Sequence, residues 1–135
     1  MEGATEKGLT QNEAECDLPP KKEIYLFAGL SEKQLNLYKE ILSQELPTEE
    51  KPSLLNMLMF LRKVCNHPYL FGGQEDKDLP ALGDHLINSS GKMIILDKLF
   101  AKLFKEKHKV LIFTQMTRVL DTLEDYCVFK KYNVQ

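Results

Sequence analysis

A cysteine and a histidine stand two positions apart in the stretch LRKVCNHPYLF, which covers residues 61–71. A thiol beside an imidazole is the chemistry of a nucleophile with its base, or of half a zinc site. Side chains two positions apart on a helix point to different faces, which argues against a hydrogen-bonded Cys65–His67 pair. The sequence therefore favours a structural role, in which Cys65 packs as a small hydrophobe and His67 with Pro68 ends a helix.

A zinc site at Cys65 and His67 would need further ligands. Zinc usually takes about four, often in closely spaced pairs. The other candidates form no second tight pair, and they are Cys16, His85, His108 and Cys127. We therefore expect no metal site. A stand-alone zinc or Cys–His protein stays open as an alternative.

The run Ser90-Gly91-Lys92 resembles the end of a phosphate-binding loop. A P-loop would have Gly where this chain has Leu86, and Ser or Thr where it has Met93. The run is therefore not a Walker A loop. A lysine at a helix N-terminus can still contact a phosphate of a nucleic-acid backbone, which makes Lys92 a candidate.

The run TQMTR, residues 114–118, follows a short apolar segment at residues 110–113. That segment lies between predicted helices and shows no alternation, which predicts a strand buried on both faces. In open α/β sheets, ligands bind at the carboxyl ends of the strands. Hydroxyl, amide and guanidinium groups beside a helix N-terminus suit contact with a phosphate backbone. Ordinary capping of the turn needs the same residue types, so both interpretations stay open.

Two short strands and four helices are expected to position these residues. Besides the strand at residues 110–113, the apolar segment at residues 23–28 predicts a mostly buried strand, and residues 72–84 predict a loop. Helices are expected to begin near Ser31, Ser53, Lys92 and Thr117. The predicted fold class is therefore α/β and mainly helical by content.

Each predicted helix carries its own start or stop signal and an apolar face. Ser31 and Gln34 form a capping-box pattern, and Pro68 should end the second helix at Asn66 or His67. The expected apolar faces are Leu35, Tyr38, Ile41, Leu42 and Leu46; Leu54, Leu55, Met57, Leu58, Leu61, Val64 and Cys65; Met93, Leu96, Leu99, Phe100, Leu103 and Phe104; and Val119, Leu120, Leu123, Tyr126 and Cys127. The second face covers more than half of its helix, which predicts a helix wedged between partners.

The composition is that of a soluble globular protein. Hydrophobic residues make up 43% and charged residues 28%, and the formal net charge is −2, so any nucleic-acid contact must come from a local patch. Three widely spaced cysteines indicate a reducing compartment. No signal peptide or membrane-spanning stretch is present in the sequence, and we expect an intracellular protein without a membrane partner.

Four blocks of the sequence follow one another in a familiar order. They are LPPKKE at 18–23, LLNMLMFLRKVCNHPYLF at 54–71, NSSGKMIILDKL at 88–99 and KVLIFTQMTRVLDTLEDY at 109–126. Together they resemble the ATPase core of the imitation-switch (ISWI) group of Swi/Snf-type chromatin remodellers, which are DNA translocases of helicase superfamily 2. The structural signature of the resemblance is Leu61, Arg62, Lys63, Cys65, Asn66, His67 and Pro68.

The resemblance implies a division of the chain. Residues 1–17 would be a disordered leader, residues 18–84 the end of RecA-like lobe 1 with its helical protrusion, and residues 85–135 the truncated start of the helicase C-terminal domain, lobe 2. The family binds ATP and DNA between its lobes, and the run from residue 109 resembles the region that lies against one DNA strand. This carry-over makes Thr114, Gln115, Thr117 and Arg118 the main DNA-backbone candidates, with Lys92 as a further one.

The family's catalytic motifs are not found in these residues. There is no Walker A loop, no Asp-Glu-x-His box and no arginine-finger stretch, and phosphoryl transfer needs all three parts. We expect no catalytic residue and no cofactor in this chain, with ATP and Mg²⁺ bound by the full motor. The resemblance implies DNA, nucleosomes and other remodeller subunits as partners, and the nucleus as location.

Two interpretations of the product follow. In the first, the chain is a fragment, isoform or truncated gene model of a remodelling ATPase, and it contributes the bridge between lobes and contacts with the DNA backbone. In the second, it is a short non-catalytic product that binds an intact remodeller or chromatin through its helices. We also expect marginal stability and exposed apolar surface for the isolated chain.

Overall fold

The computed structural model describes residues 19–43, 53–75 and 77–134. Its elements are the helices α2 (Glu32–Ser43), α3 (Leu54–Asn66), α4 (His85–Asn88), α5 (Gly91–Lys105) and α6 (Thr117–Lys130), with the short 3₁₀ helix η1 (Pro68–Leu70) after α3. The predicted leader at residues 1–17, including Cys16, lies outside the described residues, and so does Leu46. No helix in the described ranges has both the length and the apolar character needed to cross a membrane.

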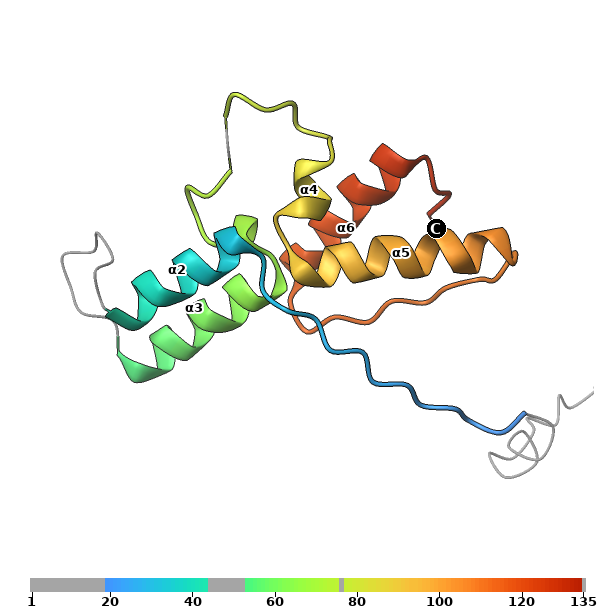
Figure 1. Cartoon of the computed structure of the whole chain (residues 1–135), viewed down its shortest axis with the longest axis horizontal. Helices are drawn as coiled ribbons and strands as arrows, with labels where there is room; N and C mark the ends of the chain where they lie inside the picture. The colour runs from blue at the N-terminus through green and yellow to red at the C-terminus, as the bar shows by residue number, and fades with distance from the viewer. Residues whose placement is uncertain (1–18, 44–52, 76, 135) are drawn as a thin grey trace, which may run out of the picture.

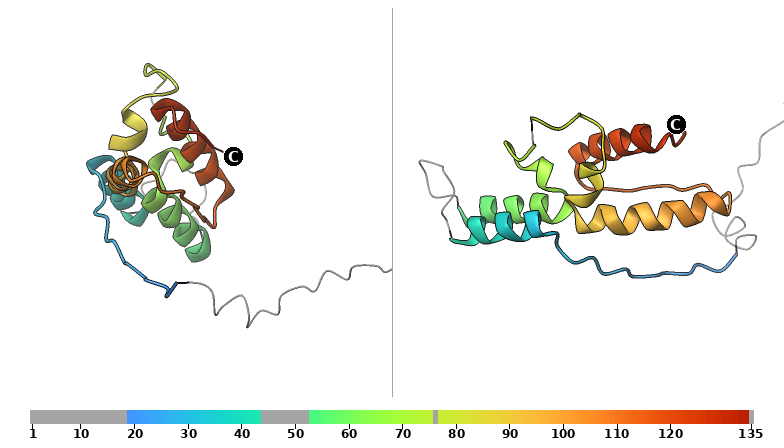
Figure 2. Two further views of the ribbon diagram at one scale, coloured as in Figure 1. Left: turned by 90° about the vertical axis from the view of Figure 1, so that its right-hand side faces the viewer. Right: turned by 45° about the horizontal axis from the view of Figure 1, so that its top comes forward.

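The helices form two arms that meet in the middle of the molecule (Figure 1). One arm is the antiparallel pair of α2 and α3, and the other holds α4, α5 and α6 (Figure 2). The N-termini of α2, α5 and α6 and the C-terminus of α3 lie close together where the arms meet. Residues from distant parts of the sequence are therefore brought to one place.

The helix boundaries follow local signals in the sequence. The capping box is confirmed, because the Ser31 N–H donates to Gln34 Oε1 at 3.0 Å and the Gln34 N–H donates to Ser31 Oγ at 3.2 Å. Ser53 caps α3 by accepting the Asn56 N–H at 3.3 Å. Helix α3 ends at Asn66, and His67 is already extended, as expected for a residue before proline.

Two other boundaries differ slightly from prediction. Thr117 was expected to cap the last helix, but it is the first helical residue and Met116 holds the cap position. The short helix α4 was not predicted, and it directly follows the expected loop at residues 72–84. Four residues are too few for apolar periodicity to reveal a helix.

The two predicted strands are wrong for the described part of the chain. Residues 23–28 and 110–113 form neither strand nor helix and run as long uncoiled segments (Figure 1). Their burial was also mispredicted, since Phe27 is 95% exposed and Phe113 is 91% exposed. An apolar run becomes a strand only when another backbone pairs with it, and these segments have no such partner among the described residues. The expected mainly helical content is confirmed, whereas a RecA-like lobe stays a prediction.

Each arm has its own apolar core. The N-terminal core consists of Leu37, Ile41 and Val64, and the C-terminal core consists of Ile87, Met93, Phe100, Leu123, Tyr126 and Cys127. The predicted faces of α5 and α6 supply most of the second core. In α2 the prediction was partly wrong, because Leu37 is buried while Leu35 and Leu42 are exposed. Among the described elements the helix packs mainly on α3, with a smaller contact to η1, so a narrower face suffices.

Helix α3 is not wedged between partners in the described structure. Val64 is its one buried residue, and Leu54 is 73% exposed, with Leu55, Leu58 and Met59 also exposed. The expectation that the whole apolar circumference would be covered is therefore wrong here. The other expectation, an exposed apolar surface, is confirmed.

A polar contact fixes α5 to α6 beside the C-terminal core. The Tyr126 hydroxyl donates to Asp97 Oδ1 at 2.8 Å, and Lys130 Nζ lies 2.9 Å from the same oxygen. Burial alone would raise the pKa of Asp97, but the hydrogen bonds from Lys130 and Tyr126 outweigh it and hold that pKa below its ordinary value. The carboxylate therefore stays charged and keeps both partners over a wide pH range.

Candidate functional site

Two neighbouring hollows open where the arms meet. The first has a volume of about 340 Å³ and is lined by Arg62, Asn66, Lys92, Phe113, Thr114 and Gln115. The second has a volume of about 270 Å³ and is lined by Met59, Lys63, Leu70, Gln115, Met116, Thr117 and Arg118. Gln115 lines both hollows, so they form one continuous surface.

Three segments supply the polar side chains of this surface, and η1 adds the apolar Leu70. The last turns of α3 contribute Arg62, Lys63 and Asn66, and the first turn of α5 contributes Lys92. The segment before α6 and its first turn contribute residues 113–118. We call Arg62, Lys63, Lys92 and Arg118 the cation cluster.

Two members of the cation cluster, Arg62 and Lys92, are held by neutral oxygens. Arg62 Nη2 donates to Gln115 Oε1 at 2.5 Å, and Lys92 Nζ donates to Asn66 Oδ1 at 2.7 Å. Amide oxygens orient these cations without neutralising them. In the described part of the chain no carboxylate lines either hollow, and the ion pairs found there involve Lys21, His108 and Lys130 rather than the cluster. The surface therefore combines positive charge with hydrogen-bond donors, which suits a polyanion.

The five predicted backbone-contact residues lie on this one surface. Lys92, Thr114 and Gln115 line the first hollow, and Thr117 and Arg118 line the second with Gln115. Thr114 Oγ1 also accepts the Met116 N–H at 3.3 Å, which shapes the turn as ordinary capping would. The structure brings these five residues together on one surface, whereas their role in DNA binding stays a prediction.

Arg62, Lys63 and Asn66 were predicted only as a structural signature, yet they line the hollows. A signal for them was present in the sequence. Arg62 and Lys63 are the only charged residues in the mainly apolar α3, and Asn66 lies four positions after Arg62, on the same face. What could not be read from the sequence is that residues 113–118 return to this face.

Lys92 and Gly91 play different parts at the start of α5. The Gly91 N–H donates to Gln34 Oε1 at 3.0 Å, so this helix N-terminus does not offer that donor to a phosphate. The Lys92 side chain is exposed and reaches the first hollow. A phosphate near α5 would therefore meet the lysine rather than the full set of N-terminal amides.

Both ring nitrogens of His67 are used within the fold. A backbone N–H can only donate, so Nδ1 accepts from Tyr69 at 3.2 Å and Nε2 donates to Leu86 O at 2.8 Å. No ring nitrogen is left to act as a base for Cys65. No group of three or more potential ligands close enough to hold a metal ion occurs among the described residues. The structural interpretation of Cys65–His67 is the one that the contacts support.

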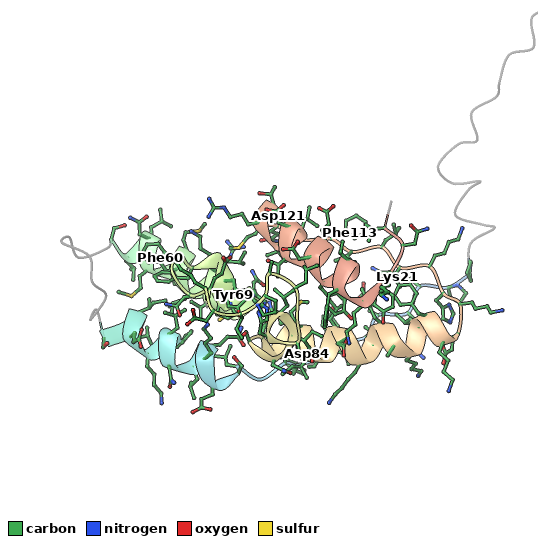
Figure 3. The ribbon with its side chains drawn as sticks, turned by 90° about the horizontal axis from the view of Figure 1, so that it is seen from above. Lys21, Phe60, Tyr69, Asp84, Phe113 and Asp121 are labelled. Carbon is green, nitrogen blue, oxygen red and sulfur yellow. The ribbon has the colours of Figure 1, made fainter. Side chains whose placement is uncertain are left out.

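His67 joins the two arms together with Tyr69, which lies between them (Figure 3). The Tyr69 hydroxyl is 2.9 Å from His85 Nδ1, and Lys33 Nζ lies 4.9 Å from the centre of the Tyr69 ring. Burial lowers the pKa of His67, and the nearby Lys33 and His85 act in the same direction, opposed by the bond to Leu86 and by Glu75. The imidazole therefore stays neutral down to a lower pH in the folded chain than in the unfolded chain.

We expect the free energy of unfolding to fall as the pH drops below about 6.5, the ordinary histidine pKa. The unfolded chain takes up the proton more readily than the folded chain, so this part of the stability is fully present above that pH. It is lost as the pH falls from there toward the lower folded-state pKa. Urea unfolding at several pH values would measure the loss.

In the variant His67→Gln, the free energy of unfolding should depend less on pH in the same window. The glutamine amide can still donate to Leu86 O, but it does not titrate. The matched control is His108→Gln, at an exposed histidine, which should keep the wild-type slope. An equal slope for wild type and His67→Gln would contradict the assignment.

Comparison with known proteins shows similarity to chromatin proteins. The model of the SNF2-related domain matches residues 8–70. The human "SWI/SNF-related matrix-associated actin-dependent regulator of chromatin subfamily A member 1" is 48% identical over 128 residues, which cover 90% of this chain and 12% of that protein. An ISWI chromatin-remodeling complex ATPase of Arabidopsis thaliana is 48% identical over 126 residues, with the same coverage of 90% and 12%.

A relative with another kind of name also matches. The zebrafish (Danio rerio) "Chromodomain-helicase-DNA-binding protein 1-like" is 43% identical over 128 residues, which cover 91% of this chain and 12% of that protein. The similarity thus extends over nearly the whole chain but over only about one eighth of each of these relatives. It also reaches beyond proteins named ISWI.

Proposed function

We propose that this chain is a segment of a Snf2-type chromatin-remodelling ATPase and that, within the longer motor, it bridges the two lobes and contacts the DNA backbone. Identities of 43–48% over about nine tenths of the chain support this assignment. The finer assignment to the ISWI group rests on the sequence blocks and on the relatives that carry that name.

We further propose the domain division at residue 84. The buried residues of the N-terminal core all come from α2 and α3, and the C-terminal core begins with Ile87 in α4. Two separate cores support a boundary between a helical protrusion at residues 18–84 and the start of lobe 2 at residues 85–135. In this proposal the contact between arms is the bridge between lobes.

The cation cluster is the observation that carries the DNA contact. Its four side chains come from three segments. Among the described residues, the hollows that they face are lined by hydroxyls, amides and apolar side chains and by no carboxylate. Arginine, lysine, threonine and glutamine are the side chains that contact DNA phosphates, where they position a protein without reading sequence. We therefore propose Arg62, Lys92, Gln115, Thr117 and Arg118 as backbone contacts, with Thr114 and Lys63 beside them.

Chemistry is assigned to other parts of the motor. The printed sequence holds neither a phosphate cradle nor a metal-binding Asp-Glu box, so we propose that ATP and Mg²⁺ bind elsewhere in the longer protein. Nucleosomes, other remodeller subunits and a nuclear location follow from the same proposal.

A second candidate function is a non-catalytic interaction module. It is favoured by the exposed apolar face of α3, formed by Leu54, Leu55, Leu58 and Met59. A pull-down with intact remodeller subunits would test it, and capture that persists when Leu54 and Leu55 are replaced by Ser would contradict this face as the contact.

DNA binding by the 135-residue chain tests the main proposal. We expect weak binding to a labelled duplex at low salt, measured by fluorescence anisotropy, and a loss of about tenfold or more in the triple variant Arg62→Glu, Lys92→Glu and Arg118→Glu. The slope of log K against log salt should flatten by about 0.9 for each phosphate that the variant no longer neutralises. No DNA-stimulated ATP hydrolysis is expected.

The matched control is a second triple variant that changes the net charge by the same amount but at residues away from the hollows. Lys98, Lys102 and Lys105 are exposed on α5 and line neither hollow. Their triple replacement by Glu should leave most of the affinity and the salt slope in place. Equal losses in both triple variants would show a non-specific charge effect, and DNA-stimulated ATP hydrolysis would overturn the assignment of chemistry to other parts.

A further inference from the structure

The side chain of Gln34 is fully buried, with 0% exposure, at the point where the two arms meet. Its Oε1 accepts the N–H groups of Ser31 and Gly91, both at 3.0 Å. Its Nε2 donates to the Val64 carbonyl at 2.7 Å. One amide thus contacts the backbones of three segments: the start of α2, the end of α3 and the start of α5.

These three contacts satisfy helix-end groups that have no partner within their own helices. The first N–H groups and the last carbonyls of any helix are left unpaired, and they must be satisfied when buried. Ser31 and Gly91 supply such N–H groups and Val64 supplies such a carbonyl. An amide can accept two hydrogen bonds and donate a third here, whereas an ionised carboxylate has no donor and an apolar side chain has neither donor nor acceptor.

The backbone contacts lie next to the cation cluster. Val64 directly follows Lys63 at the end of α3, and Gly91 directly precedes Lys92 in α5. A second bond supports the same joint, since the buried Ser90 donates its hydroxyl to the Asn66 carbonyl at 2.8 Å. The Gln34 amide therefore fixes the end of α3 against the start of α5.

Helix α2 itself contributes no residue to either hollow. We infer that Gln34 is a positioning residue: its amide sets the spacing between the α3 cations and Lys92, and thereby the affinity of the cation cluster for nucleic-acid phosphates. The part about affinity rests on the proposed function, whereas the part about spacing does not. The contact between Lys92 Nζ and Asn66 Oδ1 at 2.7 Å is the spacing that the joint maintains.

Two variants test this inference in the 135-residue chain. Gln34→Met keeps the shape and removes all three bonds, while Gln34→Glu keeps the acceptor for both N–H groups and removes the donor to Val64. The readouts are amide hydrogen exchange at Gly91 and the affinity for duplex DNA with its salt slope. Asn36→Met, at an exposed amide on the same helix, is the matched control.

In Gln34→Met we expect the Gly91 amide to exchange at least about tenfold faster while the amides of Leu123 and Tyr126 keep their protection. DNA affinity should fall and the salt slope should flatten by about 0.9, the value for one phosphate that is no longer neutralised. Gln34→Glu should keep Gly91 protected and still lose affinity, because the end of α3 is released. Asn36→Met should match wild type.

Other outcomes separate the inference from the proposed function. If the Gly91 amide of Gln34→Met were as protected as in wild type, Gln34 would not hold the start of α5 against the end of α3. Faster exchange throughout the chain would show that Gln34 has a merely structural role. Faster exchange at Gly91 with unchanged DNA affinity would overturn the positioning role, provided that the triple cation variant binds weakly. If the triple variant also binds like wild type, the proposed function is wrong, and selective exchange at Gly91 still supports the joint.

Discussion

Replacing Gly91 with alanine is expected to lower the free energy of unfolding by about 3 kcal/mol. A Cβ at this position would lie 1.7 Å from the Gly29 carbonyl oxygen and 2.9 Å from its carbonyl carbon. Both atoms belong to the backbone, so no side-chain rotation can relieve the overlap. Helix propensity alone predicts the opposite sign, because alanine is the better helix former by about 1 kcal/mol.

Relief of this overlap must move the segment that contains Gly29 away from α5. That movement pulls on the hydrogen bond from Ser31 Oγ to Ser89 O, at 2.6 Å, and on the bond from the Gly91 N–H to Gln34. The alanine variant therefore loses part of the joint between the arms. The stability lost through these contacts should exceed the stability gained from the better helix propensity of alanine.

Urea unfolding followed by circular dichroism would measure the effect. Gly72→Ala is the matched control, since nothing lies within 4 Å of its added Cβ. We expect this control to stay within about 0.5 kcal/mol of wild type. A Gly91→Ala chain that is as stable as wild type, or more stable, would show that Gly29 does not press on α5 in solution.

Replacing Phe100 with alanine is expected to lower the free energy of unfolding by about 3–5 kcal/mol. Phe100 is 3% exposed and lies at the centre of the C-terminal core. Its ring centre is 5.5 Å from that of Phe104 and 6.1 Å from those of Tyr126 and Tyr132. Alanine would remove these edge and tilted ring contacts and leave a cavity between α5 and α6.

A loss of this size should unfold the C-terminal core first. The N-terminal core, formed by Leu37, Ile41 and Val64, shares no buried residue with it. We therefore expect the variant to lose amide protection in α5 and α6 before it loses protection in α2 and α3. The milder variant Phe100→Leu should show the same order with a smaller loss of stability.

Phe27→Ala is the control for removing a phenyl ring, because Phe27 is 95% exposed. Its effect should be within about 0.5 kcal/mol. A similar loss in Phe27→Ala and Phe100→Ala would mean that the extended segment packs in solution as tightly as the core. A single cooperative loss of protection in all helices would contradict the independence of the two cores.

Local signals in the sequence predicted the helix boundaries well. The capping box of Ser31 and Gln34, the cap at Ser53 and the stop before Pro68 depend on neighbouring residues only, and the structure has all three. The apolar faces of α5 and α6 were largely predictable, because they supply every buried residue of the C-terminal core except Ile87. Leu120 is the exception on α6, since it is 47% exposed. The signals that succeeded are those whose physical cause lies within a few residues.

Features that depend on distant residues could not be predicted in the same way. The apolar runs at residues 23–28 and 110–113 have the composition of strands, but a strand also needs a second backbone. The burial of Leu37 instead of Leu35 depends on the angle at which α3 lies against α2. For the same reason the sequence revealed Gln34 as a cap but not as a contact of Val64 and Gly91.

The candidate site also combines residues that the sequence indicated with residues that only the tertiary structure brings together. The residue types of the run at 114–118 indicated a phosphate contact, and those side chains do share one surface with Lys92. The contribution of Arg62 and Asn66 came from another helix and depended on the path of the chain between α5 and α6. The cation cluster is thus a product of tertiary structure rather than of any one motif.

The meeting of four helix ends at one point makes that point a pivot. Helix α5 has 15 residues and so extends about 22 Å from it, at about 1.5 Å per residue. A rotation of about 10° between the arms would displace the far end of α5 by about 4 Å on that length. The cation cluster, which lies at the pivot, would hardly move. In the proposed function, a DNA backbone bound at the cation cluster would therefore stay bound while the angle between the arms changes.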